Sequence, residues 1–239
     1  YLETLSYIDN GLHKSNHIAQ AGNTYTIKAS AEGFPSVKAT DKLPYPVSII
    51  NATSSVGSFY YESEGETGVG YEFKTTFSDP QDRNYYELLF LKHNVNTFSS
   101  TFINYISCHV ADSVFSDEDY FGYDPRNFIF SDNTFNGGTI EVTMKMKDQY
   151  GQFEYPSSLD TLPNGNYTVL RTVSEPYYLF MKSWMKHYFN LQSISYESID
   201  LVAMLLGIGT NPVPLYSNVE NGFGLVAAYS QVYYQTELI

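Results

Sequence analysis

The chain has 239 residues, of which 43% are hydrophobic and 16% charged, and this balance favours a folded globular protein over a disordered one. Its 26 acidic and 13 basic residues give a formal net charge of -13, which repels phosphate backbones and argues against a nucleic-acid partner. A single cysteine, Cys108, excludes both an internal disulfide and a zinc site built on a thiol pair.

The first elements in chain order form a predicted hairpin. Residues 23–30 alternate between apolar and polar side chains, which predicts a half-buried strand. A turn at "AEGFPS" and a second short strand ending at Pro44 come next. The pair looks like the closing hairpin of a small β-sandwich whose other strands are missing or lie in the first twenty residues. Two prolines in "LPYPVSI" indicate a stiff connector, so we predict domains at 1–46 and 47–239.

The second predicted domain is rich in short strands separated by polar turns. Its composition, with 23 Tyr and 16 Phe in the chain, favours the pleated surface on which wide side chains pack well. Strand-like runs lie at residues 48–55, 69–79, 84–94, 104–113, 127–132, 138–147 and 167–174. The cleanest alternation is "GTIEVTMKMK", with Ile140, Val142, Met144 and Met146 on one face. Together these runs predict an antiparallel sandwich or barrel-like sheet.

One segment, residues 174–193, predicts a helix. Ser174 can cap it, Pro176 suits its first turn, and no glycine lies between residues 177 and 193. An apolar and aromatic stripe recurs at helical spacing, which predicts that this face of the helix lies on the sheet. The fold class we predict is therefore mainly β, with one main helix at about 175–190.

The stretch "NPVPLYSNVENGFGLVAAYS", residues 211–230, combines two prolines, several turn-forming residues and an apolar run. Its prolines enforce extended backbone, and Asn218, Asn221 and Gly222 predict a turn with positive φ. "FGLVAAYS" then predicts a last strand that joins the sheet. A competing interpretation is that Tyr216, Asn218 and Asn221 line a ligand-binding pocket, and both interpretations stay open.

Among the residues that could bind a metal or catalyse a reaction, one group forms a candidate metal site. Asp117, Asp119 and Asp124 in "SDEDYFGYD" resemble part of a calcium loop, but Phe121 and Phe128 occupy the fifth and twelfth positions, where an EF-hand needs oxygen ligands. A looser calcium site and a solvated acidic loop both remain open. No catalytic constellation is visible and no motif for a cofactor occurs, so we predict neither an enzyme nor a cofactor.

Four segments in order resemble the domain of unknown function 4249 family. They are "AEGFPSVKATDKLPYPVSI", "FIFSDNTFNGGTIEVTMKM", "SEPYYLFMKSWMKHY" and "NPVPLYSNVENGFGLVAAYS". The resemblance implies an immunoglobulin- or transthyretin-like first domain, a β-rich second domain, and a Bacteroidetes lipoprotein of the cell envelope, anchored at the outer membrane. This chain lacks the lipobox cysteine and most of that first domain, so a lipid anchor is implied by the family and not seen here.

The leading functional hypothesis is a non-catalytic envelope protein that binds a ligand or partner beside a TonB-dependent outer-membrane transporter. Tyrosine-rich surfaces suit glycan or peptide contacts, because the ring offers apolar area together with a hydroxyl. The alternatives are a glycan hydrolase with paired carboxylates and a structural or adhesive surface module.

Overall fold

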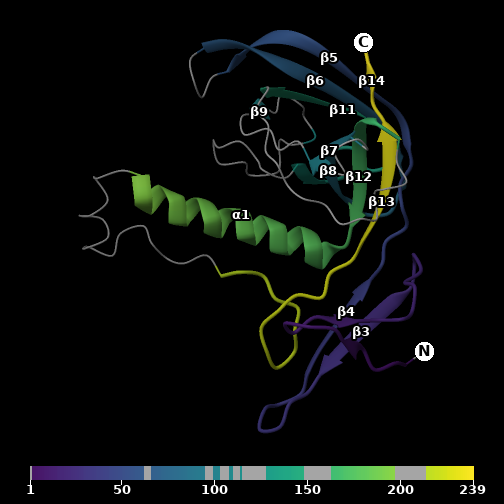
Figure 1. Cartoon of the computed structure of the whole chain (residues 1–239), viewed down its shortest axis with the longest axis vertical. Helices are drawn as coiled ribbons and strands as arrows, with labels where there is room; N and C mark the ends of the chain where they lie inside the picture. Colours follow the sequence, from purple (N-terminus) through teal and green to yellow (C-terminus); the bar gives the residue numbers. More distant parts are fainter. Residues whose placement is uncertain are drawn as a thin grey trace.

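The computed structural model describes residues 2–61, 66–94, 99–102, 108–109, 114, 128–147, 163–196 and 214–239, and the fold is mainly β with one helix, as predicted (Figure 1). The elements in chain order are β1 (Ser6–Tyr7), β2 (His13–Lys14), β3 (Thr24–Ala29), β4 (Val37–Lys42), β5 (Ile49–Tyr61), β6 (Glu66–Asp79), β7 (Tyr85–Asn94), β8 (Ser99–Phe102), β9 (Cys108–His109), β10 (Phe128–Ser131), β11 (Gly138–Lys147), β12 (Gly165–Val173), α1 (Glu175–Tyr196), β13 (Tyr229–Gln235) and β14 (Glu237–Leu238).

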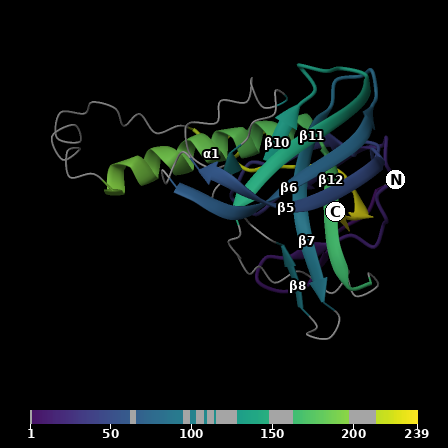
Figure 2. The ribbon, with the colours of Figure 1, turned by 90° about the horizontal axis from the view of Figure 1, so that it is seen from above.

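Two five-stranded sheets form the main body. The first has the order β14-β5-β6-β11-β9, and the second has the order β10-β7-β12-β13 with β8 also paired to β7. All pairs in both sheets are antiparallel except β14 with β5. Figure 2 shows the two sheets as stacked layers whose strands cross. The predicted sandwich-like architecture is confirmed.

The core lies between these two sheets and is largely aromatic. Alternation along each strand turns every second side chain inward, as in Phe73 and Phe77 of β6 and Leu88 and Phe90 of β7. The Phe73 and Phe90 rings, one from each sheet, lie 4.3 Å apart between centroids. Burial of this apolar surface is the main force that holds the layers together.

Strand β11 confirms the alternation in its sequence. Val142 and Met144 are buried, Ile140 is half-buried, and Glu141 is exposed. Its register with β6 runs unbroken from Gly138↔Asp79 to Lys147↔Gly70. The other predicted strands also match observed ones, apart from residues 104–113, of which only Cys108–His109 lie within the described residues.

The first part of helix α1 lies on the outer face of the second sheet, and its other end runs out past the strands (Figure 1). The Ser174 Oγ accepts a hydrogen bond from the Tyr177 N–H at 3.4 Å, so the predicted cap is observed. Tyr177, Tyr178, Met181, Trp184 and Met185 of the helix pack against Tyr85, Ile129 and Val173 of the sheet. The prediction that the aromatic face covers the sheet is confirmed.

Hairpin β3–β4 and residues 214–228, which we call the C-terminal loop, lie side by side below the helix in Figure 1. Lys38 and Glu220 exchange two backbone hydrogen bonds and form a salt bridge of 3.1 Å. The Asn221 side chain donates to the Ser36 carbonyl at 3.5 Å. Whether the hairpin is the remainder of an immunoglobulin- or transthyretin-like domain ending near residue 46 stays a prediction.

The predicted last strand at "FGLVAAYS" is wrong. Residues 223–228 are irregular, and β13 begins only at Tyr229 and pairs with β12. The cause is a side chain upstream: Asn218 donates to the Val226 carbonyl at 2.8 Å and accepts from the Val226 N–H at 2.9 Å. Because both backbone groups of Val226 are taken by one amide side chain, they cannot enter a sheet ladder.

Candidate functional site

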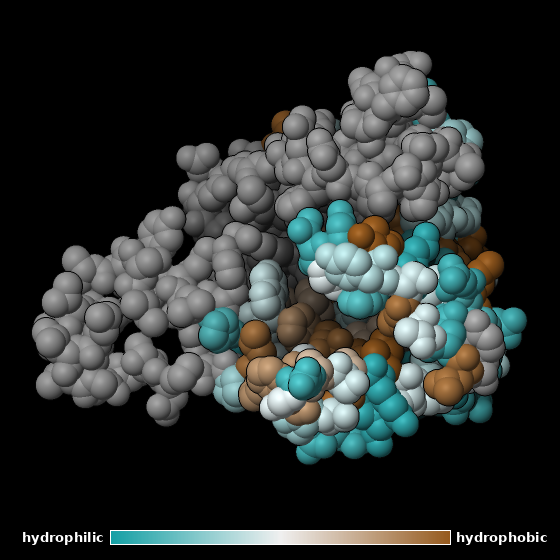
Figure 3. Space-filling view, turned by 60° about the horizontal axis from the view of Figure 1, so that its bottom comes forward, coloured by the Kyte–Doolittle hydropathy of each residue, from teal (hydrophilic) through white to brown (hydrophobic). Residues whose placement is uncertain are grey.

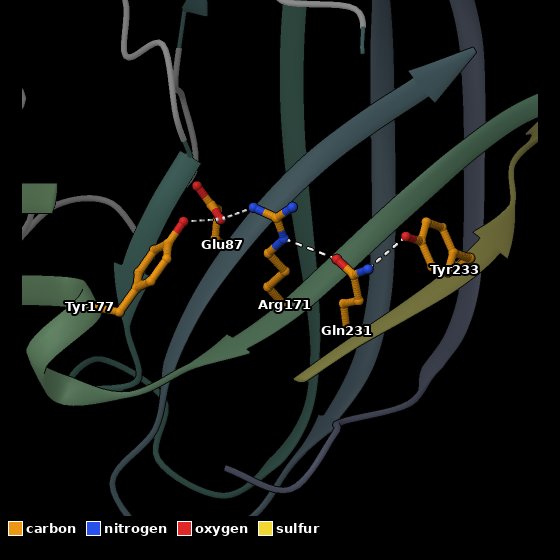
Figure 4. A network of polar contacts seen from close by, with 5 residues as sticks. All are labelled: Glu87, Arg171, Tyr177, Gln231 and Tyr233. Carbon is orange, nitrogen blue, oxygen red and sulfur yellow. Dashed lines mark hydrogen bonds and ion pairs between the residues drawn. The ribbon is translucent and has the colours of Figure 1, made fainter. Parts of the chain in front are cut away.

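A row of polar side chains crosses three strands on the outer face of the second sheet. Glu87 of β7 lies opposite Arg171 of β12, and Arg171 lies opposite Gln231 of β13. The Arg171 Nη1 donates to the Glu87 Oε2 at 2.9 Å, and the Arg171 Nε donates to the Gln231 Oε1 at 3.1 Å (Figure 4). Register alone therefore brings the three side chains together, since directly opposed residues share a face.

Three tyrosines complete this cluster, which we call the Glu87–Arg171 network. The Tyr177 hydroxyl, from the first turn of α1, donates to the Glu87 Oε2 at 2.9 Å, and the Gln231 amide donates to the Tyr233 hydroxyl at 2.6 Å (Figure 4). The guanidinium carbon of Arg171 lies 4.5 Å from the centroid of the Tyr229 ring, a cation–π contact.

The ion pair of the network is buried, and its two charges neutralise each other. The exposed fractions of the Glu87 and Arg171 side chains are 2% and 9%. Burial, and then the negative charge of Glu87, raise the pKa of the Tyr177 hydroxyl above its ordinary value, so this hydroxyl keeps its proton and donates a hydrogen bond. One oxygen of the Glu87 carboxylate accepts two strong hydrogen bonds, from Arg171 and from Tyr177. These bonds hold the start of the helix on the sheet and leave that oxygen occupied, so it is not placed to act as a general base.

A second buried polar cluster lies where β6 and β10 end and β7 begins. The Asp79 carboxylate accepts hydrogen bonds from the Tyr86 hydroxyl and from the Gly137 N–H, and Asp132 accepts one from the Asn84 N–H at 2.6 Å. Burial is the main cause that raises the pKa of Asp132, and the charge of Asp79 adds to it. Both carboxylates are used to satisfy backbone and hydroxyl donors at the turns that join the sheets.

A third buried carboxylate joins the hairpin to the helix. Asp41 of β4 is 8% exposed and accepts a hydrogen bond from the Lys42 N–H at 2.8 Å. Burial raises the pKa of Asp41, and the nearby Ser174 side chain and the Lys42 and Ala228 backbone oppose that shift. Its second oxygen, Oδ2, has no hydrogen-bond partner among the described residues. The positive end of the α1 dipole, which Ser174 caps, favours the charged form of Asp41 and so offsets part of the effect of burial.

The residues predicted as a ligand site share the C-terminal loop but serve its own structure. Asn218 closes the loop on Val226, and Asn221 has a φ of 61°, which confirms the predicted turn with positive φ. The Tyr216 N–H donates to the Ser183 Oγ of α1 at 2.9 Å, which ties the loop to the helix. Whether these side chains also contact a ligand stays a prediction.

The calcium candidates Asp117, Asp119 and Asp124 lie outside the described residues. Within the residues that the structure describes, no group of three or more His, Cys, Asp or Glu side chains could hold a metal ion. Within the same residues, no helix is both long and apolar enough to cross a membrane.

Sequence reasoning missed the Glu87–Arg171 network, although a signal was present. Glu87 is the one charge in "NYYELLFL", and Arg171 is the one charge in "YTVLRTV". Single charges inside apolar strands indicate buried partners, because an unpaired buried charge is costly. The sequence could not show that the strand register sets these two residues opposite each other.

Large apolar side chains are exposed on the side of the molecule that carries the hairpin and the C-terminal loop. Phe34, at the hairpin turn, is 75% exposed, Tyr45 is 68% exposed, and Phe223 in the loop is 88% exposed. Figure 3 brings this side forward and shows hydrophobic residues around a hollow, with hydrophilic groups beside them. Contiguous exposed apolar surface marks interaction sites more often than isolated exposed residues do, so this side of the molecule is the candidate interaction surface.

The fold defines a β-sandwich protein with one helix packed on its second sheet. In the described part of the chain, the buried polar clusters support the protein's own structure. The chain matches the family described as Domain of unknown function (DUF4249) over residues 3–235, nearly its whole length, and it belongs to that family. No curated protein and no solved structure matched it.

Proposed function

We propose that this protein is a non-catalytic binding protein of the cell envelope, an outer-membrane lipoprotein that acts beside a TonB-dependent transporter and contacts that transporter or its glycan or peptide substrate. The envelope location and the transporter come from the family resemblance described above. The binding role is supported by two exposed phenylalanine rings, Phe34 of the hairpin and Phe223 of the C-terminal loop.

The observation that carries the proposal is the exposed apolar surface of the hairpin and the C-terminal loop. Phe34 lies two residues before Ser36, and Phe223 lies two residues after Asn221, whose side chain bonds the Ser36 carbonyl. The two exposed rings thus stand at neighbouring turns. Aromatic residues, Phe included, are enriched at protein interfaces, where a few buried anchors supply most of the binding energy.

The polar clusters support the same proposal. In the Glu87–Arg171 network one carboxylate oxygen is held by both an arginine and a tyrosine, and the Asp79 and Asp132 carboxylates are held by backbone N–H groups. A general acid or base must reach a proton on its substrate, and these groups are instead committed to the fold.

The experiment that tests the proposal is an affinity pull-down of the intact protein from its own cell envelope. We expect a transporter component to co-purify with the wild type, and its recovery to fall in the double variant Phe34→Ser, Phe223→Ser. The matched control is Val56→Ser with Val69→Ser, because these residues are 57% and 61% exposed but lie on β5 and β6 of the first sheet.

Two results would count against the proposal. One is a wild-type pull-down that recovers no envelope protein and binds no glycan or peptide in a screen. The other is equal loss of the partner in the Phe34, Phe223 variant and in the Val56, Val69 control, since that would show a general loss of solubility.

A further inference from the structure

We propose that the open edge of β3 is a docking site for an extended peptide segment in which acidic and apolar residues alternate. This inference rests on the proposed function, because it names the surface and the chemistry through which a protein partner would bind. It is carried by three independent features of the β3–β4 hairpin: its backbone hydrogen bonds, its charges and its apolar face.

The backbone hydrogen bonds show which groups of the hairpin point outward. In an antiparallel pair, residues alternate between those that bond across the pair and those whose N–H and C=O point away from it. Both backbone groups of Lys38 bond to Glu220, so they point away from β3. Lys28, the register partner of Lys38, therefore points its own backbone groups away from β4.

The other end of the hairpin gives the same alternation. The Leu43 N–H donates to the Asn23 carbonyl at 3.0 Å, so the neighbouring pair, Thr24↔Lys42, is again one whose backbone groups point outward. Thr24, Thr26 and Lys28 thus present their N–H and C=O groups along the free side of β3. No strand in the described part of the chain pairs with that side. Such an edge is a template for an added strand.

One face of the hairpin carries an unusual concentration of positive charge. The register sets Lys28 opposite Lys38 and Thr24 opposite Lys42, so three lysines share this face in a chain whose formal net charge is -13. Like charges directly opposite each other destabilise a strand pair. Carboxylates on an added strand next to Lys28 would relieve that repulsion, as Glu220 does for Lys38.

The opposite face of β3 is apolar and only partly covered. Tyr25 and Ala29 flank Ile27, which is 46% exposed, whereas Ala39, its register partner on β4, is buried. Because successive side chains of an added strand also alternate between faces, its residues on this side gain by being apolar. The two faces together specify a segment with alternating acidic and apolar positions.

A second copy of the chain fits this edge less well. The β3 strand of another copy would bring threonines and one more lysine to the lysine face, and no carboxylate. The observations therefore favour an acidic partner segment.

The test is a fluorescence-anisotropy titration of the full chain with a labelled nonapeptide that alternates glutamate and valine. A nonapeptide that alternates lysine and valine is the control ligand. We expect only the acidic peptide to bind, and we expect added salt to weaken that binding.

Two proline variants locate the binding edge. Thr26→Pro removes an outward N–H from β3, whereas Thr40→Pro removes the equivalent outward N–H from β4, opposite Thr26. Both substitutions also remove the hydrogen bond of 2.8 Å between the two threonine hydroxyls. We expect about a tenfold loss of affinity in Thr26→Pro and less than about a twofold change in Thr40→Pro. Lys28→Glu should also weaken binding.

Three results would overturn the docking site. They are equal binding of both peptides, equal affinity of the Thr26→Pro and Thr40→Pro variants, and protection of the Thr24, Thr26 and Lys28 amides from hydrogen exchange in the absence of peptide. The last result would show that a second copy or another chain segment already occupies the edge.

The envelope pull-down separates this inference from the proposed function. If the wild type and Thr26→Pro recover the same partner equally, the proposed function stands and the β3 site is overturned. If no partner is recovered but the acidic peptide binds through β3, the site stands and the proposed function fails.

Discussion

The sandwich and the hairpin use the same residue types in opposite ways. Phe77 in β6 is fully buried and lies 5.0 Å from the Tyr86 ring between centroids, whereas Phe34 at the hairpin turn is 75% exposed. The sandwich closes two five-stranded sheets over a shared core, but the hairpin is two strands with one free edge. Two strands cannot bury both of their faces, so the hairpin depends on the C-terminal loop and the helix for support. The sandwich therefore supplies stability, and the hairpin supplies accessible surface.

The largest expected effect is the difference in lost stability between aromatic substitutions in the sandwich and in the hairpin. Phe77→Ala leaves a cavity among the buried rings and should lower the free energy of unfolding by about 3–5 kcal/mol, measured by chemical denaturation. Phe34→Ala should change it by less than about 0.5 kcal/mol, because that ring is exposed. Similar losses in the two variants would contradict the division between core and surface.

The next effect tests whether the Glu87–Arg171 network serves stability. Arg171→Met leaves the buried Glu87 carboxylate without its ion-pair partner and should cost about 3 kcal/mol in unfolding free energy. The double variant Glu87→Leu, Arg171→Met should recover most of that loss, because no buried charge then remains.

The matched control for this pair is Lys74→Met. Lys74 pairs with Glu72 at 3.3 Å, and its side chain is 45% exposed, so its removal should cost less than about 1 kcal/mol. If the Arg171 and Lys74 variants lose the same stability, burial is not what makes the network important.

A smaller effect is expected in the C-terminal loop. Asn218→Ala removes both hydrogen bonds to Val226, which should cost about 1–3 kcal/mol locally and raise hydrogen exchange across residues 214–228. The amides of β12 should keep their protection. Loss of ligand binding with unchanged loop exchange would instead support the alternative that Asn218 contacts a ligand.

The smallest effect depends on pH and concerns the contact between helix and sheet. Burial, and then the hydrogen bond to Glu175, raise the pKa of Tyr85 to about 12 from 10.0. Since the folded chain holds this proton more tightly than the unfolded chain, the stability from this group is complete below pH 10 and is lost between pH 10 and about 12. Tyr85→Phe should make the decline in unfolding free energy over this window shallower, and an identical decline would contradict the assignment.

Most of the sandwich could be predicted from local patterns, because each strand carries its own alternation. Strand β11 and the cap at Ser174 are examples in which the local signal agrees with the packing. Strand β13 was misplaced because "FGLVAAYS" is apolar, whereas "YSQVYYQ" mixes polar and aromatic residues on both faces. The decisive contact there, Asn218 with Val226, follows from the shape of the loop and not from composition.

The candidate site was harder to predict, since it depends on register. Residues 87, 171 and 231 meet only because β7, β12 and β13 are adjacent, and no periodicity within one strand encodes that order. The proximity of the turns that carry Phe34 and Phe223 likewise depends on the contact between Asn221 and Ser36, which are far apart in the sequence.

The most direct test of the central claim is amide hydrogen exchange of the protein alone and with its envelope partner. The division into scaffold and binding surface predicts that the partner protects Thr24, Thr26, Lys28 and residues 214–228, and leaves β6, β7 and β12 unchanged. Protection confined to the sandwich strands around Glu87 and Arg171, with no change in the hairpin or the loop, would contradict it.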